Sequence, residues 1–216
     1  MISKFKYLCV IFGYLAIISV SPLTFANSLH MGGVTLTEEH YQRLEQGEIL
    51  IFEERHELDD GRKEVWMQAS ILVNAHPEDC WRVLNDLAHY YEFQPRLRES
   101  KIVERQDSST IMRLSFKAVW KNVFYHLKYT REDEKMVLHY SLYPALPHNI
   151  GDTKGWWQAI PYHNITIINY VSYVDTGMWI PDFIQRIFIK KELPKIVSYI
   201  KRRIESGGTW NQWKEK

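Results

Sequence analysis

The chain has 216 residues, of which 45% are hydrophobic and 25% are charged, with a formal net charge of +1. This length and composition suit one globular domain with an appended segment, and the balanced charge argues against binding of nucleic acid through an overall field. Aromatic residues depart from an ordinary composition, at 14% of the chain with 13 Tyr and 8 Trp. Such side chains build cores, and they also line cavities that hold apolar ligands through a few polar groups.

The N-terminus, residues 1–26, has the pattern of a secretory signal peptide. Lys4 and Lys6 precede an uncharged apolar run over residues 7–20, and small residues at 24–26 offer a cleavage site. We therefore expect a periplasmic or secreted protein, with an uncleaved N-terminal anchor as the alternative. Cleavage would remove two Lys and no acid, so that 25 basic residues would face 26 acidic ones, a net charge of −1.

A short N-terminal extension, residues 27–46, precedes the main domain. Thr37 is a suitable N-cap and Gly47 a suitable stop, which predicts a short helix between them. Two strands are expected next, over residues 48–58 and 63–74, because the Asp-Asp-Gly between them has the chemistry of a hairpin turn.

The most distinctive segment runs from residue 71 to residue 95. An apolar strand end leads to Pro77, which suits the first turn of a helix, and Trp81 and Leu84 continue with helical spacing. The pattern predicts a strand that feeds two short helices. Cys80, the single cysteine after cleavage, would lie on the apolar side of the first helix, as a buried hydrophobe rather than a nucleophile.

After Pro95, apolar and polar residues alternate in a series of segments joined by polar turns. The expected strands span residues 100–105, 110–119, 123–129, 136–142, 156–160 and 165–174, with a loop over 144–151. Short connections predict an antiparallel meander that forms one curved sheet. The fold class is therefore α+β.

The hydrophobic period changes again after Ile180. Apolar residues from Phe183 to Ile204 recur with helical spacing, which predicts a long C-terminal helix lying across the concave face of the sheet. Pro194 lies inside this helix, so a kink or break is expected there. The last residues, 207–216, are expected to form a flexible tail.

Several local motifs occur in a specific order along the chain. They are Val73-Asn74-Ala75-His76-Pro77-Glu78-Asp79-Cys80-Trp81 with Leu84, Asp86, Tyr91 and Pro95; Gly155-Trp156-Trp157; Tyr170; Ile180-Pro181; and Leu193-Pro194. Together they resemble the START-like superfamily, also called Bet v 1-like or SRPBCC, the polyketide cyclase and lipid-transport group, and within it the exported bacterial branch.

The resemblance implies a helix-grip fold over residues 47–206, in which a curved antiparallel sheet wraps around a long C-terminal helix and leaves a cavity. It also implies binding of lipids, sterols, polyketides or other apolar molecules, with cyclisation or aromatisation in a minority of members. Hydrophobic alternation selects the candidate cavity wall. These residues are Leu114, Phe116, Tyr125, Leu127, Tyr129, Leu138, Tyr140, Trp157, Phe183, Ile187 and Phe188. A shift of one residue in a strand would invert the choice.

The sequence offers little catalytic chemistry. Nine His residues are scattered singly, without the spacing of a metal site, so no metal, cofactor or catalytic residue is predicted. His126 and His139 fall on neighbouring strands and could approach one another, but their alternation with apolar residues favours an outward orientation. An enzyme would need only one positioned acid-base group in the cavity. The candidates for it are Tyr125, Tyr129, Tyr140 and Arg113.

A basic run lies on the polar face of the last helix. Lys190, Lys191 and Lys195 belong to it, and they are interpreted either as a solvated face or as a transient contact with an anionic membrane surface.

Three functions remain as hypotheses. The first is non-enzymatic binding or transport of a lipid or other hydrophobic small molecule in the cell envelope. The second is a cyclase or aromatase that acts on a polyketide-like or aromatic substrate. The third is an interaction module, which predicts a collapsed cavity filled by Tyr and Trp.

Overall fold

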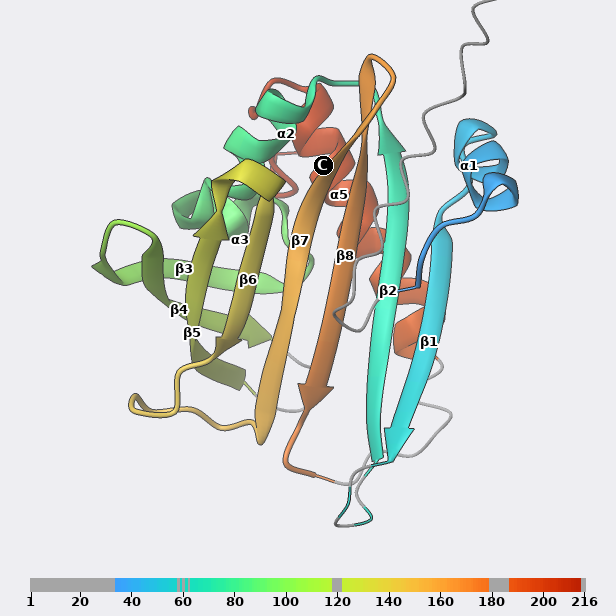
Figure 1. Cartoon of the computed structure of the whole chain (residues 1–216). Helices are drawn as coiled ribbons and strands as arrows, with labels where there is room; N and C mark the ends of the chain where they lie inside the picture. The colour runs from blue at the N-terminus through green and yellow to red at the C-terminus, as the bar shows by residue number, and fades with distance from the viewer. Residues whose placement is uncertain are drawn as a thin grey trace, which may run out of the picture.

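The computed structural model describes residues 34–57, 59, 61, 63–117, 122–178 and 187–214. They form one antiparallel sheet of eight strands in the order β1-β2-β8-β7-β6-β5-β4-β3, with the C-terminal helix and the short helices of residues 77–93 on its concave side (Figure 1). The expected signal peptide and Phe183 lie outside the described residues. Within the described ranges, no helix is both long and apolar enough to cross a membrane.

The elements follow the predicted order. The strands are β1 Leu50–Glu57, β2 Lys63–Val73, β3 Leu97–Arg105, β4 Ser109–Lys117, β5 Asn122–Glu132, β6 Val137–Leu142, β7 Asp152–Tyr162 and β8 Ile165–Asp175. The helices are α1 Glu38–Glu45, α2 Pro77–Leu84, η1 Leu87–His89, α3 Tyr90–Phe93, η2 Asp133–Lys135, η3 Phe188–Glu192 and α5 Leu193–Glu205.

The sheet is a meander that closes back on its first hairpin. Strands β3 to β8 each pair with the next along the chain, and β8 then pairs with β2. Register shifts between Leu97 and Glu99 and between Ile102 and Glu104 disturb β3. Such irregularities bend a strand, and in Figure 1 β3 and β4 run steeply across the direction of β7 and β8. The sheet is therefore strongly curved at this end.

The segment 71–95 forms the predicted strand and short helices. Pro77 occupies the first turn of α2, and Cys80, Val83 and Leu84 are buried. Helix α2 packs against β7 and β8, while α3 packs against β3. These helices close one end of the space enclosed by the sheet.

The described part of the C-terminal helix widens immediately before Pro194. The Leu193 N–H donates to the Phe188 carbonyl, five residues back, so η3 is a π-helical turn. Because a proline has no N–H and crowds the preceding turn, the wider turn admits Pro194 without ending the helix. The predicted break at this residue does not occur, since the π-helical turn leads directly into α5.

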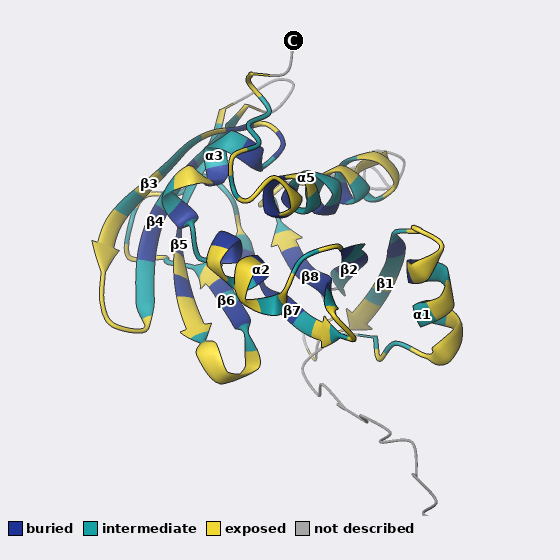
Figure 2. Cartoon of the chain, turned by 90° about the horizontal axis from the view of Figure 1, so that it is seen from above, coloured by how far each residue is buried: buried dark blue, intermediate teal, exposed yellow. Residues whose placement is uncertain are grey.

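Helix α5 lies inside the curve of the sheet (Figure 2). Val197, Ile200 and Ile204 are buried, and the helix packs chiefly against β2. The concave side of β4 to β7 consequently has little helix over it.

The C-terminal tail differs from the prediction of a flexible segment. Gln212 Nε2 donates to the carbonyls of Tyr91 at 3.0 Å and Gln94 at 2.7 Å, and Trp213 Nε1 donates to Tyr91 O at 2.8 Å. Helix α3 is a single turn whose last carbonyls have no partner within the helix. The tail supplies those partners and packs against α3.

Strand β7 begins earlier than the sequence indicates. The sequence predicts that this strand begins at residue 156, but Asp152 already pairs with Asp175 and Gly155 with Ser172. Glycine in a sequence often indicates a turn. Here Gly155 lies within the strand, and the Tyr140 side chain crosses the strand at this glycine.

Candidate ligand cavity between the sheet and the helix

A cavity of about 490 Å³ lies between the concave face of the sheet and the start of the C-terminal helix. It occupies the part of the concave face that α5 does not cover. This volume lies in the range of sites for small molecules, and the lining is predominantly apolar.

The structure brings most of the predicted wall residues together around this cavity. The lining includes Leu114, Phe116, Tyr125, Leu127, Tyr129, Tyr140, Trp157, Ile187 and Phe188. Strand pairing accounts for the agreement, because Leu114 lies opposite Tyr125 and Tyr129 lies opposite Tyr140. That these residues contact a ligand stays a prediction.

Leu138 does not line the cavity. It is fully buried in the core. On α2, Trp81 Nε1 donates to Asp133 Oδ1, just before the start of β6, so α2 covers this end of the strand. Leu138 therefore has the predicted parity but is packed within the core and does not reach the cavity.

Several lining residues were missed. They include Met67, Tyr90, Leu97, Val123, Thr153, Tyr170, Ser172, Val174, Met178 and Ile196. Strand β8 shows why, since Ile167, Ile168 and Val171 are all buried and both faces of the strand are covered. A strand buried on both sides loses the alternation from which parity is read.

The polar groups of the inner cavity are mainly phenols. The tyrosine cluster consists of Tyr90, Tyr125, Tyr129, Tyr140 and Tyr170. The Tyr140 hydroxyl donates to the Tyr170 hydroxyl at 3.2 Å, and the Tyr90 hydroxyl donates to the Leu84 carbonyl at 2.5 Å. Burial raises the pKa of all five phenols, so each stays protonated at neutral pH.

The opposite end of the cavity is a mouth edged by charged and apolar side chains. Within the described residues, the charged lining groups are Arg96, Lys117 and Glu192, and Arg96 Nη2 lies 2.6 Å from Glu192 Oε1. This ion pair links the turn after α3 to η3. It marks the boundary between the uncharged interior and solvent.

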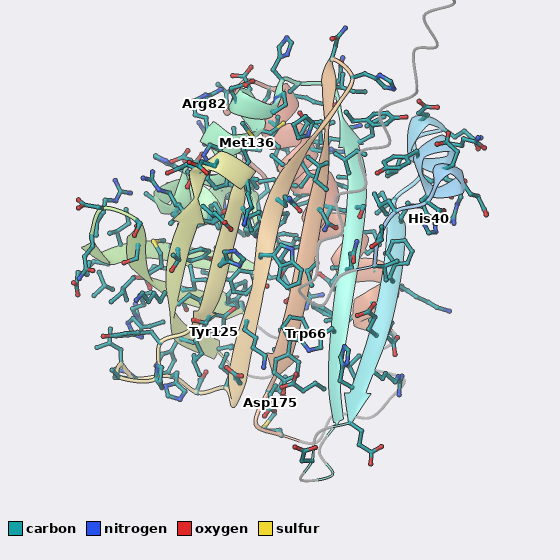
Figure 3. The ribbon with its side chains drawn as sticks, viewed as in Figure 1. His40, Trp66, Arg82, Tyr125, Met136 and Asp175 are labelled. Atoms are coloured by element: carbon teal, nitrogen blue, oxygen red, sulfur yellow. The ribbon has the colours of Figure 1, made fainter. Side chains whose placement is uncertain are left out.

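Four large apolar residues are exposed at the same mouth. The apolar collar consists of Val174, Met178, Ile187 and Phe188, which are 41%, 48%, 49% and 39% exposed and also line the cavity. Figure 3 labels the neighbouring Asp175 at the end of β8, and Tyr125 on β5. Apolar residues gathered at one opening indicate a site of contact with an apolar partner or ligand.

The remaining candidate residues lie outside the cavity. Arg113 alternates with the lining residues of β4 and forms an ion pair with Glu99 at 2.5 Å, so it faces away from the interior. His126 is buried, with Nδ1 2.9 Å from Pro147 O. The register places His139 opposite Thr130, four positions from His126 along β5, so the two histidines do not form a pair.

A shallower hollow of about 340 Å³ lies on the convex face of the sheet. Its walls include Trp66, Trp156 and Lys154, whose Nζ lies 5.4 Å from the Trp66 ring centroid and 3.0 Å from Glu64 Oε1. Among the residues that the structure describes, no group of three His, Cys, Asp or Glu side chains could hold a metal ion.

An open cavity held between a curved sheet and a C-terminal helix defines the class of helix-grip proteins. The profile of the family described as "Polyketide cyclase / dehydrase and lipid transport" matches residues 73–200, more than half of the chain. The chain belongs to this family. No curated protein sequence matches it.

Solved structures with the same fold include both kinds of protein in that description. A STAR-related lipid transfer protein from Xanthomonas axonopodis has a TM-score of 0.62 at 16% identity, over 72% of this chain and 93% of its own. The Zhui aromatase/cyclase from Streptomyces sp. R1128 has a TM-score of 0.57 at 15% identity, over 65% of this chain and 93% of its own. Human StAR-related lipid transfer protein 5 has a TM-score of 0.56 at 10% identity, over 78% of this chain and 91% of its own. At these identities the likeness establishes the fold alone.

Proposed function

We propose that this protein binds and carries a lipid or other hydrophobic small molecule in the cell envelope, without catalysing a reaction. The open cavity of about 490 Å³ is the observation that carries the proposal. An interaction module of the third hypothesis would have its cavity filled by Tyr and Trp, whereas the rings here surround an open space. Each methylene group that leaves water for this space contributes about 0.8 kcal/mol, before the costs of binding.

Binding can be tested with a neutral fluorescent probe such as N-phenyl-1-naphthylamine. Val123 is a half-buried wall residue, and a Val123→Trp variant would place an indole in the cavity. We expect probe affinity to fall by at least about tenfold, equal to about 1.4 kcal/mol. Val103→Trp is the matched control, because Val103 is 48% exposed on β3 and is not a lining residue. Equal affinity of both variants for the probe would contradict binding in this cavity.

We also propose that the mouth exchanges ligand with an anionic membrane surface. Lys190 and Lys191 are exposed on η3, beside Ile187 and Phe188 of the apolar collar, and Lys195 is exposed on the next turn. An apolar opening flanked by cations is suited to contact a bilayer, since each basic residue close to an anionic surface contributes about 1 kcal/mol.

Vesicles of phosphatidylglycerol and phosphatidylethanolamine test this contact by co-sedimentation. A variant with Glu at Lys190, Lys191 and Lys195 is expected to lose binding. A control with the same charge change elsewhere, at Lys101, Lys128 and Lys214, is expected to retain it. Equal binding of the two variants would rule out this docking surface.

The second candidate function is ring closure or dehydration of a polyketide-like substrate. The observation in its favour is the set of phenol groups inside the cavity, because a phenol can donate a hydrogen bond to a reacting oxygen. Arg113 cannot contribute, since it lies outside. The raised pKa of Tyr125 and Tyr129 makes these groups poor bases near neutral pH. Carrier function is the better supported of the two.

A further inference from the structure

The hydroxyl groups of the tyrosine cluster are not all used in the same way. Those of Tyr90, Tyr140 and Tyr170 have protein partners: Tyr90 is bonded to the Leu84 carbonyl, and Tyr140 and Tyr170 to one another. Within the described part of the chain, the hydroxyls of Tyr125 and Tyr129 have no hydrogen-bond partner. A buried phenol without a partner loses its hydrogen bonds to water and gains none in return.

These two hydroxyls border the open space rather than being sealed in the wall. The side-chain atoms that are fully enclosed without a partner, among the residues described, belong to Asn85, Trp156, Gln158 and Arg203, and no tyrosine is among them. Tyr125 and Tyr129 both line the cavity, and Tyr129 is only 4% exposed to solvent. Their donors are therefore directed at whatever fills the cavity.

Tyr129 also lies close to other phenols of the cavity. The Tyr90, Tyr125 and Tyr170 phenols each raise the pKa of Tyr129 further, beyond the effect of burial. Ring contacts connect Tyr129 to two neighbours, with the Tyr129 and Tyr140 centroids 5.9 Å apart and the Tyr90 and Tyr129 centroids 6.2 Å apart. The Tyr125 ring stacks on Phe116, with the centroids 5.6 Å apart. Tyr129 thus lies within the cluster, while Tyr125 lies four residues nearer the mouth along β5.

Among the residues that the structure describes, none places a cation in this inner half. The cationic lining groups of the described residues, Arg96 and Lys117, are both exposed at the mouth. Along β5, the distance from Val123 at the mouth to Tyr129 is roughly 20 Å at the usual rise of a strand. A carboxylate or phosphate placed among the phenols would be buried without a counter-charge, which is strongly unfavourable.

From these observations we infer that the ligand carries an uncharged oxygen group, a hydroxyl or a ketone carbonyl, which enters first and is hydrogen-bonded by Tyr129 at the inner end, with Tyr125 as a second donor nearer the mouth. The apolar body of the ligand fills the middle of the cavity, beside Leu114, Leu127 and Trp157. The inference rests on the proposed binding function and specifies its ligand class. It excludes fatty acids and phospholipids bound with the charged group inward.

Three ligands of equal chain length separate the possibilities: decane, decanol and decanoate. Each is titrated against protein loaded with N-phenyl-1-naphthylamine, and displacement gives its affinity. Decanol is expected to bind about tenfold more tightly than decane, because the hydrocarbon leaves both phenols unpaired. Decanoate is expected to bind more weakly than decanol.

Variants then locate the preference. In a Tyr125→Phe/Tyr129→Phe double variant, the preference for decanol over decane should fall about five- to tenfold, while decane binds at least as well as before. Tyr199→Phe is the control, since Tyr199 lies on α5, packs against Trp210 and does not line the cavity. A preference that survives in the double variant, or decanoate as the tightest ligand, would overturn the inference alone. Failure of the wild-type protein to bind the probe or any of the three ligands would overturn the proposed function as well.

Discussion

Gly155 on β7 has no room for a side chain. A Cβ at this position would lie 2.6 Å from Tyr140 Oη and would collide with the Val171 carbonyl. The missing side chain lets the Tyr140 ring cross the strand, and its hydroxyl then reaches that of Tyr170. A glycine in mid-strand is thus required by the wall of the cavity rather than by a turn.

Gly155→Ala is expected to destabilise the fold by about 2 kcal/mol, because the methyl group forces the Tyr140 ring or the backbone of β8 to move. Urea denaturation measures the free energy of unfolding. Ser141→Ala, at an exposed position of β6, should change it by less than about 0.5 kcal/mol. The account of this close approach would be contradicted if both substitutions had the same small effect.

Cys80 is a second residue whose surroundings determine its chemistry. Its side chain is fully buried, and burial raises the pKa of the thiol from 9.0 to about 11. The reactive form is the thiolate, so near pH 8 the folded protein should react with a thiol reagent at least about 100-fold more slowly than the urea-unfolded protein. A Cys9→Ser variant leaves Cys80 as the single thiol for this measurement. Equal rates in the folded and unfolded protein would contradict a buried, structural cysteine.

At the scale of elements, Arg203 joins α5 to the short helices and to the tail. Its side chain is 5% exposed, with Nη1 2.8 Å from Glu92 Oε2 and 2.7 Å from the Trp210 carbonyl, and Nη2 3.7 Å from Asp86 Oδ2. The guanidinium also lies 5.3 Å from the Phe93 ring centroid. One buried cation thereby holds together three segments that close the end of the domain opposite the mouth.

Arg203→Ala is expected to cost about 3 to 5 kcal/mol of unfolding free energy, because it leaves the partly buried Glu92 without its counter-charge. Arg202→Ala, on the exposed side of the same turn, should cost about 1 kcal/mol or less. Thermal or urea unfolding of both variants gives the comparison. A loss below about 1 kcal/mol for Arg203→Ala would show that the cluster contributes little to the packing of these elements.

Elements differ in how far their sequence predicts them. The wall formed by β4, β5 and β6 could be predicted because apolar residues such as Leu114, Tyr125 and Tyr140 alternate with mostly polar ones, so the hydrophobic period records the orientation. Tyr170 could not be assigned in this way because β8 is covered on both faces. Packing of the tail was also beyond the sequence, since it depends on the carbonyls of Tyr91 and Gln94, which only the folded chain brings within reach of Gln212 and Trp213.

At the scale of the whole molecule, the tyrosine cluster couples stability to pH. Burial raises the pKa of these phenols above the ordinary 10.0, so above pH 10 the unfolded chain releases protons that the folded protein retains. The contribution of the phenols to the free energy of unfolding is therefore fully present below pH 10. It falls as the pH rises further, by about 1.4 kcal/mol per pH unit for each phenol that stays protonated in the folded protein.

Urea denaturation between about pH 8 and pH 11 measures this loss, and phenolate absorbance shows when the tyrosines ionise. We expect ionisation of the buried phenols to accompany unfolding, and the Tyr125→Phe/Tyr129→Phe variant to lose stability less steeply. Native protein whose buried tyrosines titrate fully near pH 10, before any unfolding, would contradict the burial of the cluster.

The central claim is that an apolar small molecule occupies the cavity between the sheet and the C-terminal helix. Native mass spectrometry of the gently purified protein tests it most directly, alongside the Val123→Trp variant. We predict a complex with one small molecule that organic solvent extracts intact, and a marked loss of that complex in the variant. Wild-type protein that carries no such molecule, and acquires none when mixed with lipids and polyketides, would contradict the claim.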